Sequence, residues 1–383
     1  MRRTFEYRLY PSRVQVREFE RQLAALAQLY NAMLEQRRLA WRSHGWSVTR
    51  FQQERELRDV RTLPEYAGIY SHVVQDVARR VDLAYQAFFR RVKAGEAAKG
   101  FPRFRQTRRY DSLTYKQPGN GSVRLVGTRV SLSKLAENVK LKLHRPVLGV
   151  VKSVTVKRRA GRWFVQFSCD DVPPAASLVA GVGEVGIDVG LSSFATLSTG
   201  EAISNPRYGK AALARLARAQ RVLARRRKGS NRRRKQVRVV ARQHVHVVNQ
   251  RWDHAFKVAR GLVMRFGVIK VEDLAIGNMV KNRRLARSIS DAAWGLFIWA
   301  LECKAEEAGA LVVRVDPRGS SQACSSCGAV VRKSLAVRVH RCACGLVLGR
   351  DVNAAMNIKV RAGARPSRRV ADGRPVEPRS PRL

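Results

Sequence analysis

Apolar positions near the start of the chain first alternate and then follow a helical spacing. Phe5, Tyr7 and Leu9 alternate with polar residues, which predicts a strand that Pro11 stops. Ser12 and Gln15 have the spacing of a capping box. Two apolar stripes then recur every three or four residues: Val16, Phe19, Leu23, Leu26, Tyr30, Met33, and Val74, Val77, Val81, Ala84, Phe88. Residues 12–97 are therefore predicted to form a helical subdomain, and arginines line its outer faces.

The period changes to two between residues 110 and 170. Four segments alternate apolar and polar residues: Val123–Leu125, Val139–Leu143, Val154–Val156 and Trp163–Phe167. Ala160 and Gly161 supply a turn between the last two. This pattern predicts a small antiparallel barrel over residues 98–180, which the strand in residues 1–11 joins. The helical subdomain is then an insertion in that barrel.

The second half of the chain begins with a predicted meander of three strands, Val185–Gly190, Ala195–Thr199 and Ala202–Ser204. A basic helical region (207–265) precedes the strand Val268–Glu272. A helix that Ser290 or Asp291 caps and Gly309 ends then precedes the strand Leu311–Val315. A meander followed by helix, strand, helix, strand and helix is the element order of the ribonuclease H-like fold. The fold class predicted for the whole chain is multidomain α+β.

Three carboxylates lie at the ends of predicted elements of this fold, two on strands and one at the start of a helix. Asp188 lies in Gly186-Ile187-Asp188-Val189-Gly190, Glu272 ends an apolar strand, and Asp351 opens a helix whose dipole favours an anion. Singly, such acids are typical of solvated strand ends or helix caps. Together they favour a site where several carboxylates hold two magnesium or manganese ions about 3.5–4 Å apart for phosphodiester hydrolysis. Asp273 and Asp291 are weaker fourth candidates, and Asp273 is expected on the face opposite Glu272.

Four clustered cysteines predict a structural zinc site. Cys324 and Cys327 form one pair and Cys342 and Cys344 another, and each pair is followed by glycine. Tetrahedral coordination by four thiolates is typical of structural zinc. The second pair is one residue shorter than the usual knuckle, so His340 is an alternative ligand. The remaining cysteines, Cys169 and Cys303, lie in apolar patterns and are expected in the core.

Charge indicates the partner. The chain has 75 Lys and Arg against 29 Asp and Glu, a formal net charge of +46. Basic residues along the whole chain favour a long nucleic-acid track. A membrane surface is the rival explanation, but no apolar stretch approaches the roughly 20 residues that cross a bilayer, and the start lacks the apolar run of a secretion signal. We therefore expect a cytoplasmic, nucleoid-associated protein whose thiols stay reduced.

Particular arginines are candidates for nucleic-acid contact. Two basic runs flank the turn residues 229–231 inside the predicted nuclease domain, and such runs are in general more often solvated faces. The segment 100–105 mixes aromatic residues with arginines, as in base stacking combined with phosphate contact, or as in a packing turn. The predicted contacts are Arg103, Arg105, Arg225, Arg226, Arg227, Arg232, Arg233 and Arg234.

These motifs resemble those of the TnpB family, the RNA-guided endonucleases of insertion sequences, which are related to type V CRISPR effectors. The resemblance covers nearly the whole chain. Its supportive motifs are Arg8-Leu9-Tyr10-Pro11, Tyr30-Asn31 and Gly100-Phe101-Pro102-Arg103-Phe104. Its specific motifs are Gly186–Gly190, Val271-Glu272-Asp273-Leu274, Arg350-Asp351-Val352-Asn353-Ala354-Ala355 and Ser321-Gln322-x-Cys324-Ser325-x-Cys327-Gly328. Gly349 stands where the family often has an acid.

The resemblance implies a domain organisation. It implies a wedge barrel (1–11 and 98–180) holding a helical recognition domain (12–97), and a RuvC-like nuclease domain (181–318 and 348–363). A zinc-binding insertion (319–347) interrupts the nuclease domain, and residues 364–383, rich in Arg and Pro, are expected to be a disordered tail.

The resemblance also implies an activity and partners. A monomeric protein would bind one guide RNA transcribed from the element's end and cut double-stranded DNA beside a short flanking motif. Asp188, Glu272 and Asp351 would hold the two metal ions. The alternatives are a nuclease-silent RNA-guided repressor, which retention of all three acids disfavours, and an RNA-independent transposase. A plain zinc-ribbon RNA-binding protein would leave the acids unexplained.

Overall fold

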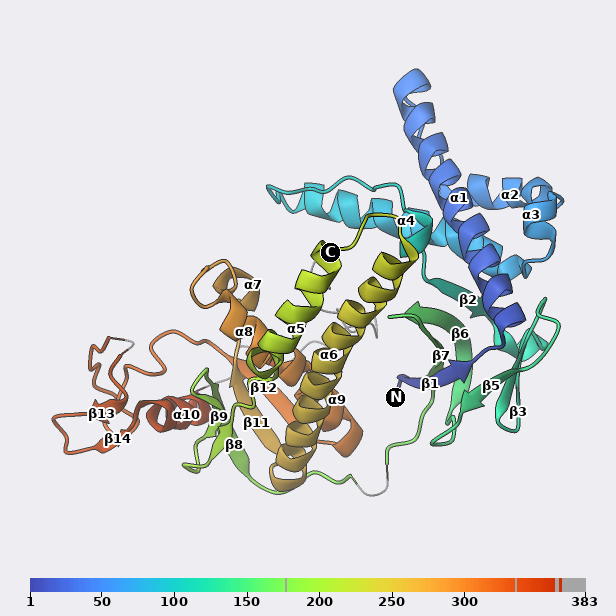
Figure 1. The fold of residues 1–383 in the computed structure, drawn as a ribbon. Helices are drawn as coiled ribbons and strands as arrows, with labels where there is room; N and C mark the ends of the chain where they lie inside the picture. Colours follow the sequence, from blue (N-terminus) through green and yellow to red (C-terminus); the bar gives the residue numbers. More distant parts are fainter. Residues whose placement is uncertain (176–177, 335, 362–364, 367–383) are drawn as a thin grey trace. The chain divides into compact units, whose positions relative to one another are not determined.

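The structure is a computed structural model that describes the chain except residues 176–177, 335, 362–364 and 367–383 (Figure 1). The chain divides into two compact units, Arg2–Pro173 and the part from Pro174 onward. None of the helices in the described residues combines the length and apolar character that a bilayer crossing requires.

A seven-stranded antiparallel sheet forms the first unit's base, in the order β2-β6-β7-β1-β5-β4-β3. Its strands are β1 (Arg3–Tyr10), β2 (Ser112–Lys116), β3 (Val123–Val126), β4 (Arg129–Leu132), β5 (Val139–Lys142), β6 (Val150–Arg159) and β7 (Arg162–Asp170). The N-terminal strand pairs with both β5 and β7, as predicted. The short 3-10 turn Pro118–Asn120 contacts β6 and β3, so the sheet is nearly closed. β2 and β4 were not predicted from the sequence.

Four helices follow β1 in the same unit: α1 (Arg13–His44), α2 (Arg50–Val60), α3 (Pro64–Ala67) and α4 (Ser71–Lys93). The predicted capping box begins α1, where the Ser12 side chain accepts from the Gln15 backbone and the Gln15 side chain accepts from the Ser12 backbone. Most residues of the two predicted apolar stripes are buried where α1 packs on α4, and Val16, Ala84 and Phe88 are partly buried. The sequence pattern thus predicted α1 and α4, the first and last helices of this block. It did not predict α2 and α3, which lie between them in the chain.

The second unit contains a six-stranded sheet in the order β10-β9-β8-β11-β12-β15. Its strands are β8 (Glu184–Val189), β9 (Ser193–Leu197), β10 (Ala202–Ser204), β11 (Val268–Glu272), β12 (Leu311–Val315) and β15 (Arg365–Pro366). The first three form an antiparallel meander, and β11 runs parallel to both β8 and β12. The prediction of a disordered tail over residues 364–383 is wrong at Arg365 and Pro366, which form the short strand β15, and residues 364 and 367–383 lie outside the described residues.

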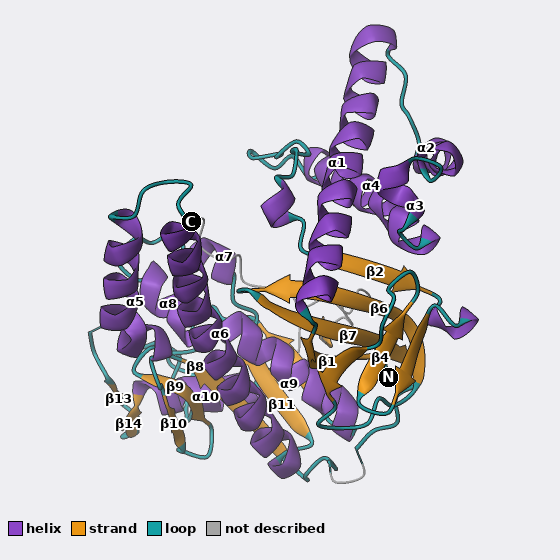
Figure 2. Ribbon diagram, turned by 45° about the vertical axis from the view of Figure 1, so that its right-hand side comes forward, coloured by secondary structure: helices purple, strands orange, loops and turns teal. Residues whose placement is uncertain are grey.

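Helices of the second unit are α5 (Tyr208–Ala224), α6 (Asn231–Arg265), α7 (Ile276–Met279), α8 (Ala286–Ala292), α9 (Trp294–Ala308) and α10 (Arg350–Val360). Apolar residues of α6 and α9 pack on Val185 and Ile187 of β8 and on Ile269 and Val271 of β11, so these helices cover one face of the sheet (Figure 2). The hairpin of β13 (Val339–Arg341) and β14 (Val347–Gly349) leads directly into α10.

The basic region 207–265 is helical, as predicted, and the turn at Gly229 divides it into two helices, α5 and α6. The predicted cap of the helix α9 is wrong. Neither Ser290 nor Asp291 caps α9, which begins at Trp294 after Ala293 in a left-handed conformation (φ 55°) and has no side-chain cap. Asp291 lies in α8 and instead accepts hydrogen bonds from the backbone N–H groups of Gly209 and Lys210, in the first turn of α5.

Candidate metal centres

Asp188 and Glu272 lie at the carboxyl ends of neighbouring parallel strands. Ile187 of β8 is in register with Val271 of β11, so the two acids occupy the next positions along the pair. Side chains alternate along a strand, and Ile187 and Val271 face the buried core. Asp188 and Glu272 therefore both face the opposite side of the sheet, away from α6 and α9.

The helix α10 lies across this opposite face and brings the third acid. A Cβ atom on Gly186 would come within 2.1 Å of the Ala355 carbonyl oxygen and 2.5 Å of the Lys359 backbone nitrogen, so only glycine allows this approach. At the far end of the helix, Lys270 donates to the Lys359 carbonyl oxygen (2.7 Å). Asp351 is in the first turn of α10, the end directed toward Asp188 and Glu272.

The charges of the three acids interact. Burial, together with the nearby carboxylates of Glu272 and Asp351, raises the pKa of Asp188 to about 8, and Arg350 opposes this shift. Burial also raises the pKa of Glu272, opposed by a hydrogen bond from Ser320 and by Arg361. A buried aspartate whose charge is disfavoured by two nearby carboxylates is an arrangement that a divalent cation relieves. Oxygen donors of this kind suit magnesium or manganese.

Asp273 and Asp291, the weaker candidates for a fourth acid of the site, form hydrogen bonds and ion pairs with other residues. Asp273 pairs with Arg314 (3.1 Å), whose guanidinium also binds Glu302 of α9, so Asp273 is on the face opposite Glu272, as predicted. Asp291 accepts from Arg251 (2.7 Å) in addition to the α5 backbone. Asp273 and Asp291 therefore have structural partners away from the three acids.

The four predicted cysteines converge. The sulfur atoms of Cys324, Cys327, Cys342 and Cys344 all lie within 4.8 Å of one another. Two of the separations are 3.7 Å (Cys324 to Cys344) and 3.5 Å (Cys327 to Cys342). Tetrahedral zinc with Zn–S bonds of about 2.3 Å requires sulfur separations of about 3.8 Å, so this cluster could hold zinc despite the short Cys-x-Cys spacing.

The environment of Cys324 also suits a metal ligand. Hydrogen bonds from the backbone N–H groups of Cys327 and Ser326, with a contribution from His340, lower the pKa of the Cys324 thiol to about 5. The alternative ligand His340 is fully buried, and its Nδ1 contacts Lys333, outside the group of four sulfurs. Cys169 is buried in the core, as predicted, and Cys303 is partly buried.

The predicted nucleic-acid arginines differ in their surroundings. Arg225, Arg226, Arg227 and Arg232 are exposed at the turn between α5 and α6. Arg233 instead donates to the carbonyl oxygens of Leu223 (2.6 Å) and Arg226 (3.1 Å), so it closes the end of α5. Arg234 is exposed and contacts Asn231 (3.3 Å).

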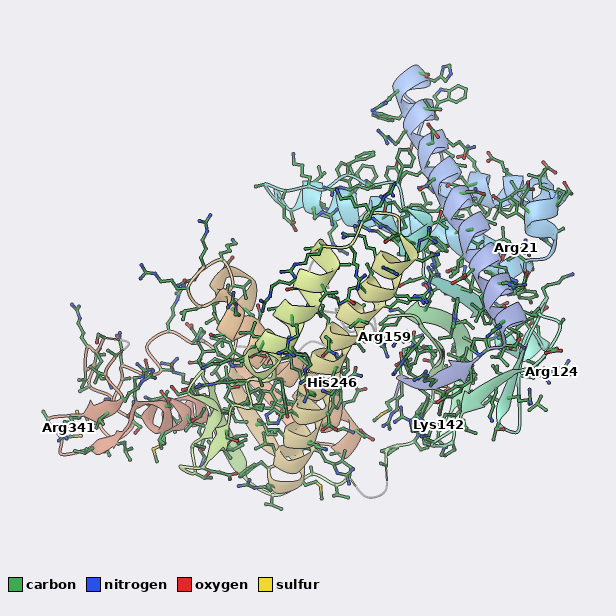
Figure 3. The ribbon with its side chains drawn as sticks, in the orientation of Figure 1. Arg21, Arg124, Lys142, Arg159, His246 and Arg341 are labelled. Carbon is green, nitrogen blue, oxygen red and sulfur yellow. The ribbon has the colours of Figure 1, made fainter. Side chains whose placement is uncertain are left out.

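In the first unit, Arg103 is exposed, whereas the Arg105 guanidinium lies 4.8 Å from the Tyr30 ring centroid. Asn31 binds both the N–H and the carbonyl oxygen of Arg105, which fixes the segment against α1. Other exposed basic side chains extend from both units, among them Arg124 and Lys142 on the sheet strands and Arg341 on β13 (Figure 3).

Three buried polar residues beside the acids were missed by sequence reasoning. Ser320 is 6% exposed, Asn353 0% and Asn357 7%. The two asparagines interrupt the apolar residues of α10 at positions i and i+4, and this spacing was the available signal. Ser320 carries no signal in the sequence, because its partner Glu272 is distant along the chain.

Family models match three parts of the chain. Residues 166–283 match a model described as "Probable transposase", residues 294–358 match "Cas12f1-like, TNB domain", and residues 1–45 match "Helix-turn-helix domain". In this structure residues 1–45 contain the strand β1 and the single long helix α1. The first two matches together contain the three acids and the four cysteines.

Curated relatives extend over most of the chain. A protein of Streptomyces pristinaespiralis named "Putative RNA-guided DNA endonuclease" is 37% identical over 94% of this chain and 89% of its own length. "Putative RNA-guided DNA endonuclease InsQ" of Escherichia coli (strain K12) is 31% identical over 75% of this chain and 73% of its own. These matches define an insertion-sequence protein of the guided-nuclease class. The chain belongs to the TnpB family.

A solved structure has a similar fold. The "Cryo-EM structure of the Cas12f1-sgRNA-target DNA complex" contains a chain that superposes with a TM-score of 0.57, covering 90% of this chain and 82% of that one at 14% identity. At this identity the likeness concerns the fold alone, and it agrees with a Cas12f-like arrangement of mixed helices and sheets.

Proposed function

We propose that this protein is an RNA-guided endonuclease that cuts double-stranded DNA beside a short flanking motif. The observation that carries the proposal is the placement of Asp188, Glu272 and Asp351 by β8, β11 and α10, where burial and the two neighbouring carboxylates raise the pKa of Asp188 to about 8. The family membership supports the guided-nuclease class, and a nuclease-silent repressor would have no need to retain all three acids. The strand order of the second unit supports a RuvC-like nuclease domain.

The acids would hold two divalent cations, magnesium or manganese. When bound, such ions activate a water molecule and stabilise the departing oxygen of the scissile phosphodiester. The protein would position the three carboxylates: β8 and β11 carry Asp188 and Glu272 on one face of the sheet, and α10 carries Asp351. Gly186, two residues before Asp188, leaves room for the backbone of α10, which carries Asp351.

The nucleic acids would contact basic surfaces on each unit. Exposed Arg225, Arg226, Arg227 and Arg232 at the α5–α6 turn suit phosphate contact. In the first unit the Arg38 guanidinium lies 5.8 Å from the Phe101 ring and 5.1 Å from the Phe104 ring, and both rings are about half exposed. Aromatic rings combined with arginine suit stacked, unpaired bases. The cysteine cluster would bind a structural zinc ion.

The test is the RNA that the protein binds in cells. The protein is purified from cells that express its gene together with the flanking DNA of the element, and the bound RNA is sequenced. We expect one abundant RNA with a constant part and a variable end, because base pairing supplies the sequence specificity of guided nucleases. Heterogeneous RNA or none would contradict guidance, and DNA end-joining products formed without RNA would favour a transposase.

A further inference from the structure

The segment between β12 and the first zinc-site cysteine, residues 316–323, crosses the edge of the acid site. We call it the strap. It has no helix or strand of its own, and residues 318–322 form turns. A segment without regular structure needs partners for its backbone groups when it is buried, so those partners determine where it lies.

Side chains of α10 supply these partners. Asn353 donates to the Ala323 carbonyl oxygen (2.7 Å), and Asn357 donates to the carbonyl oxygens of Ala323 (2.7 Å) and Ser320 (2.8 Å). Arg361 donates to the carbonyl oxygens of Asp316 and Arg318 (2.7 Å for the latter). Asn353 and Asn357 lie on one face of α10, and Arg361 immediately follows the helix, so this face and the end of α10 bind the strap along its length.

The strap delivers one hydroxyl to the acid site. Ser320 Oγ lies 2.5 Å from Glu272 Oε1, and both residues are buried. Its next contact, the Pro317 carbonyl oxygen, is 3.1 Å away. A hydroxyl has a single hydrogen, and charge-assisted bonds are the shorter and stronger ones, so this hydrogen is directed to the Glu272 carboxylate.

The segment that contains Cys324, Cys327, Cys342 and Cys344, which we call the cysteine knuckle, binds the other end of the strap. Cys324 N donates to the Ala329 carbonyl oxygen (2.9 Å), Val331 N donates to the Gln322 carbonyl oxygen (2.9 Å), and Ala323 pairs with Val330. Asn353 Oδ1 also accepts from Ser325 N (2.9 Å), immediately after Cys324. The hairpin that contains the second cysteine pair continues directly into α10, so both ends of the knuckle meet the strap or its helix.

We propose that Ser320 is a positioning residue that orients the Glu272 carboxylate for a divalent cation, and that the cysteine knuckle keeps Ser320 in place through the strap. This inference rests on the proposed nuclease site. Groups that hydrogen-bond a metal-binding carboxylate fix its orientation, and their loss typically lowers metal affinity 10- to 100-fold. The knuckle would then do more than stabilise its own local fold. Its metal ion would keep the strap in place, and the strap orients Glu272.

The experiment measures divalent-cation binding and not only cleavage. Full-length protein free of nucleic acid is titrated with Mn²⁺, and free Mn²⁺ is followed by electron paramagnetic resonance. The variants are Ser320→Ala, Ser320→Thr, which keeps a hydroxyl, and Ser321→Ala as a matched control whose hydroxyl makes none of these contacts. Asp188→Asn identifies the binding that belongs to the acid site. Zinc content is measured for each variant.

We expect Ser320→Ala to weaken Mn²⁺ binding about tenfold or more with unchanged zinc content, Ser320→Thr to restore most of it, and Ser321→Ala to match the wild type. Equal Mn²⁺ affinity in Ser320→Ala and wild type would overturn the inference and leave the proposed function standing. Absence of Mn²⁺ binding that depends on Asp188 in the wild type would overturn both.

The role of the knuckle has its own readout. Zinc is removed with a thiol-reactive reagent and a chelator, and amide hydrogen exchange is followed in the strap and in β8 and β11. We expect faster exchange in residues 320–323, unchanged exchange in the two strands, and weaker Mn²⁺ binding. Unchanged strap exchange with unchanged Mn²⁺ affinity after zinc loss would overturn the coupling.

Discussion

The protonation of Asp188 makes the stability of the folded protein depend on pH. The pKa of Asp188 in the folded protein is about 8, against an ordinary value of 3.8, because this residue is buried beside Glu272 and Asp351. Between about pH 4 and pH 8, Asp188 therefore stays protonated in the folded state, whereas it has lost its proton in the unfolded state. The stability that this proton contributes is complete below pH 4 and is lost as the pH rises through about 8.

We predict that Asp188→Asn stabilises the protein in the absence of added divalent cations. The amide cannot ionise, so the melting temperature at pH 8 should exceed that of the wild type by at least about 3 °C, and the difference should shrink at pH 5. Thermal unfolding at both pH values checks this. Asp273→Asn, at an exposed carboxylate on the opposite face, should show no such pH-dependent gain. An equal or lower melting temperature for Asp188→Asn at pH 8 would contradict the burial and coupling described above.

Single residues also show where sequence reasoning stops. Asp188, Glu272 and Asp351 were predictable because each has a place in the order of elements. Ser320 was not, because its role depends on a hydrogen bond to a residue on another strand. The prediction that Asp291 caps α9 was wrong for a related reason: a carboxylate near a helix start was assigned to that helix, although it binds the start of α5.

At the scale of elements, the contact between β8 and α10 positions the third acid. A methyl group at residue 186 would collide with the backbone of α10 at 2.1 Å and 2.5 Å, and a helix backbone cannot yield locally as a flexible side chain can. We predict that Gly186→Ala displaces α10, lowers the free energy of unfolding by about 2–3 kcal/mol or more, and reduces cleavage.

The matched control is Gly261→Ala in α6. No atom lies within 4 Å of its added Cβ, and alanine favours a helix, so this variant should be stabilised by up to about 1 kcal/mol. Chemical denaturation measures both changes. Gly186→Ala with wild-type stability would show that α10 does not approach β8 as described.

The α5–α6 turn gives a second test among neighbouring arginines. Replacing Arg225, Arg226 and Arg227 together by alanine should weaken RNA binding and reduce the slope of log affinity against log salt by about 2. Arg233→Ala should instead lower stability by about 1–2 kcal/mol, because its guanidinium binds the last carbonyl groups of α5. Filter binding at several salt concentrations and denaturation separate the two effects. A salt slope that the triple variant leaves unchanged would remove this turn from the nucleic-acid surface.

Elements were predicted best where one face is buried. The stripes of α1 and α4 and the alternation of β1, β5, β6 and β7 gave correct elements because burial imposes those periods. β2 and β4 were missed: each is short, and each gains its place by pairing with neighbours distant in the sequence or across a tight turn. The division of region 207–265 into two helices depends on a glycine turn inside a basic run that otherwise favours helix.

In the whole molecule, the net charge of +46 disfavours a compact state unless a polyanion neutralises it, and both proposed metal centres lie in the second unit. The order of elements in this unit was predictable, since strands and helices alternate in a recognisable sequence. The strap and its link between the cysteines and Glu272 was not, because it consists of hydrogen bonds between irregular backbone and helix side chains.

The central claim is that this protein cuts DNA at the place its RNA specifies. The most direct measurement reconstitutes the purified protein with its own RNA and magnesium, and offers linear double-stranded DNA that either matches the variable end of the RNA or carries a scrambled sequence. Variants Asp188→Ala and Glu272→Gln are run in parallel. We predict cleavage of the matched DNA alone, and loss of cleavage by at least about a hundredfold in both variants with RNA binding retained. Cleavage of scrambled DNA at the same rate, or wild-type cleavage by Asp188→Ala, would contradict it.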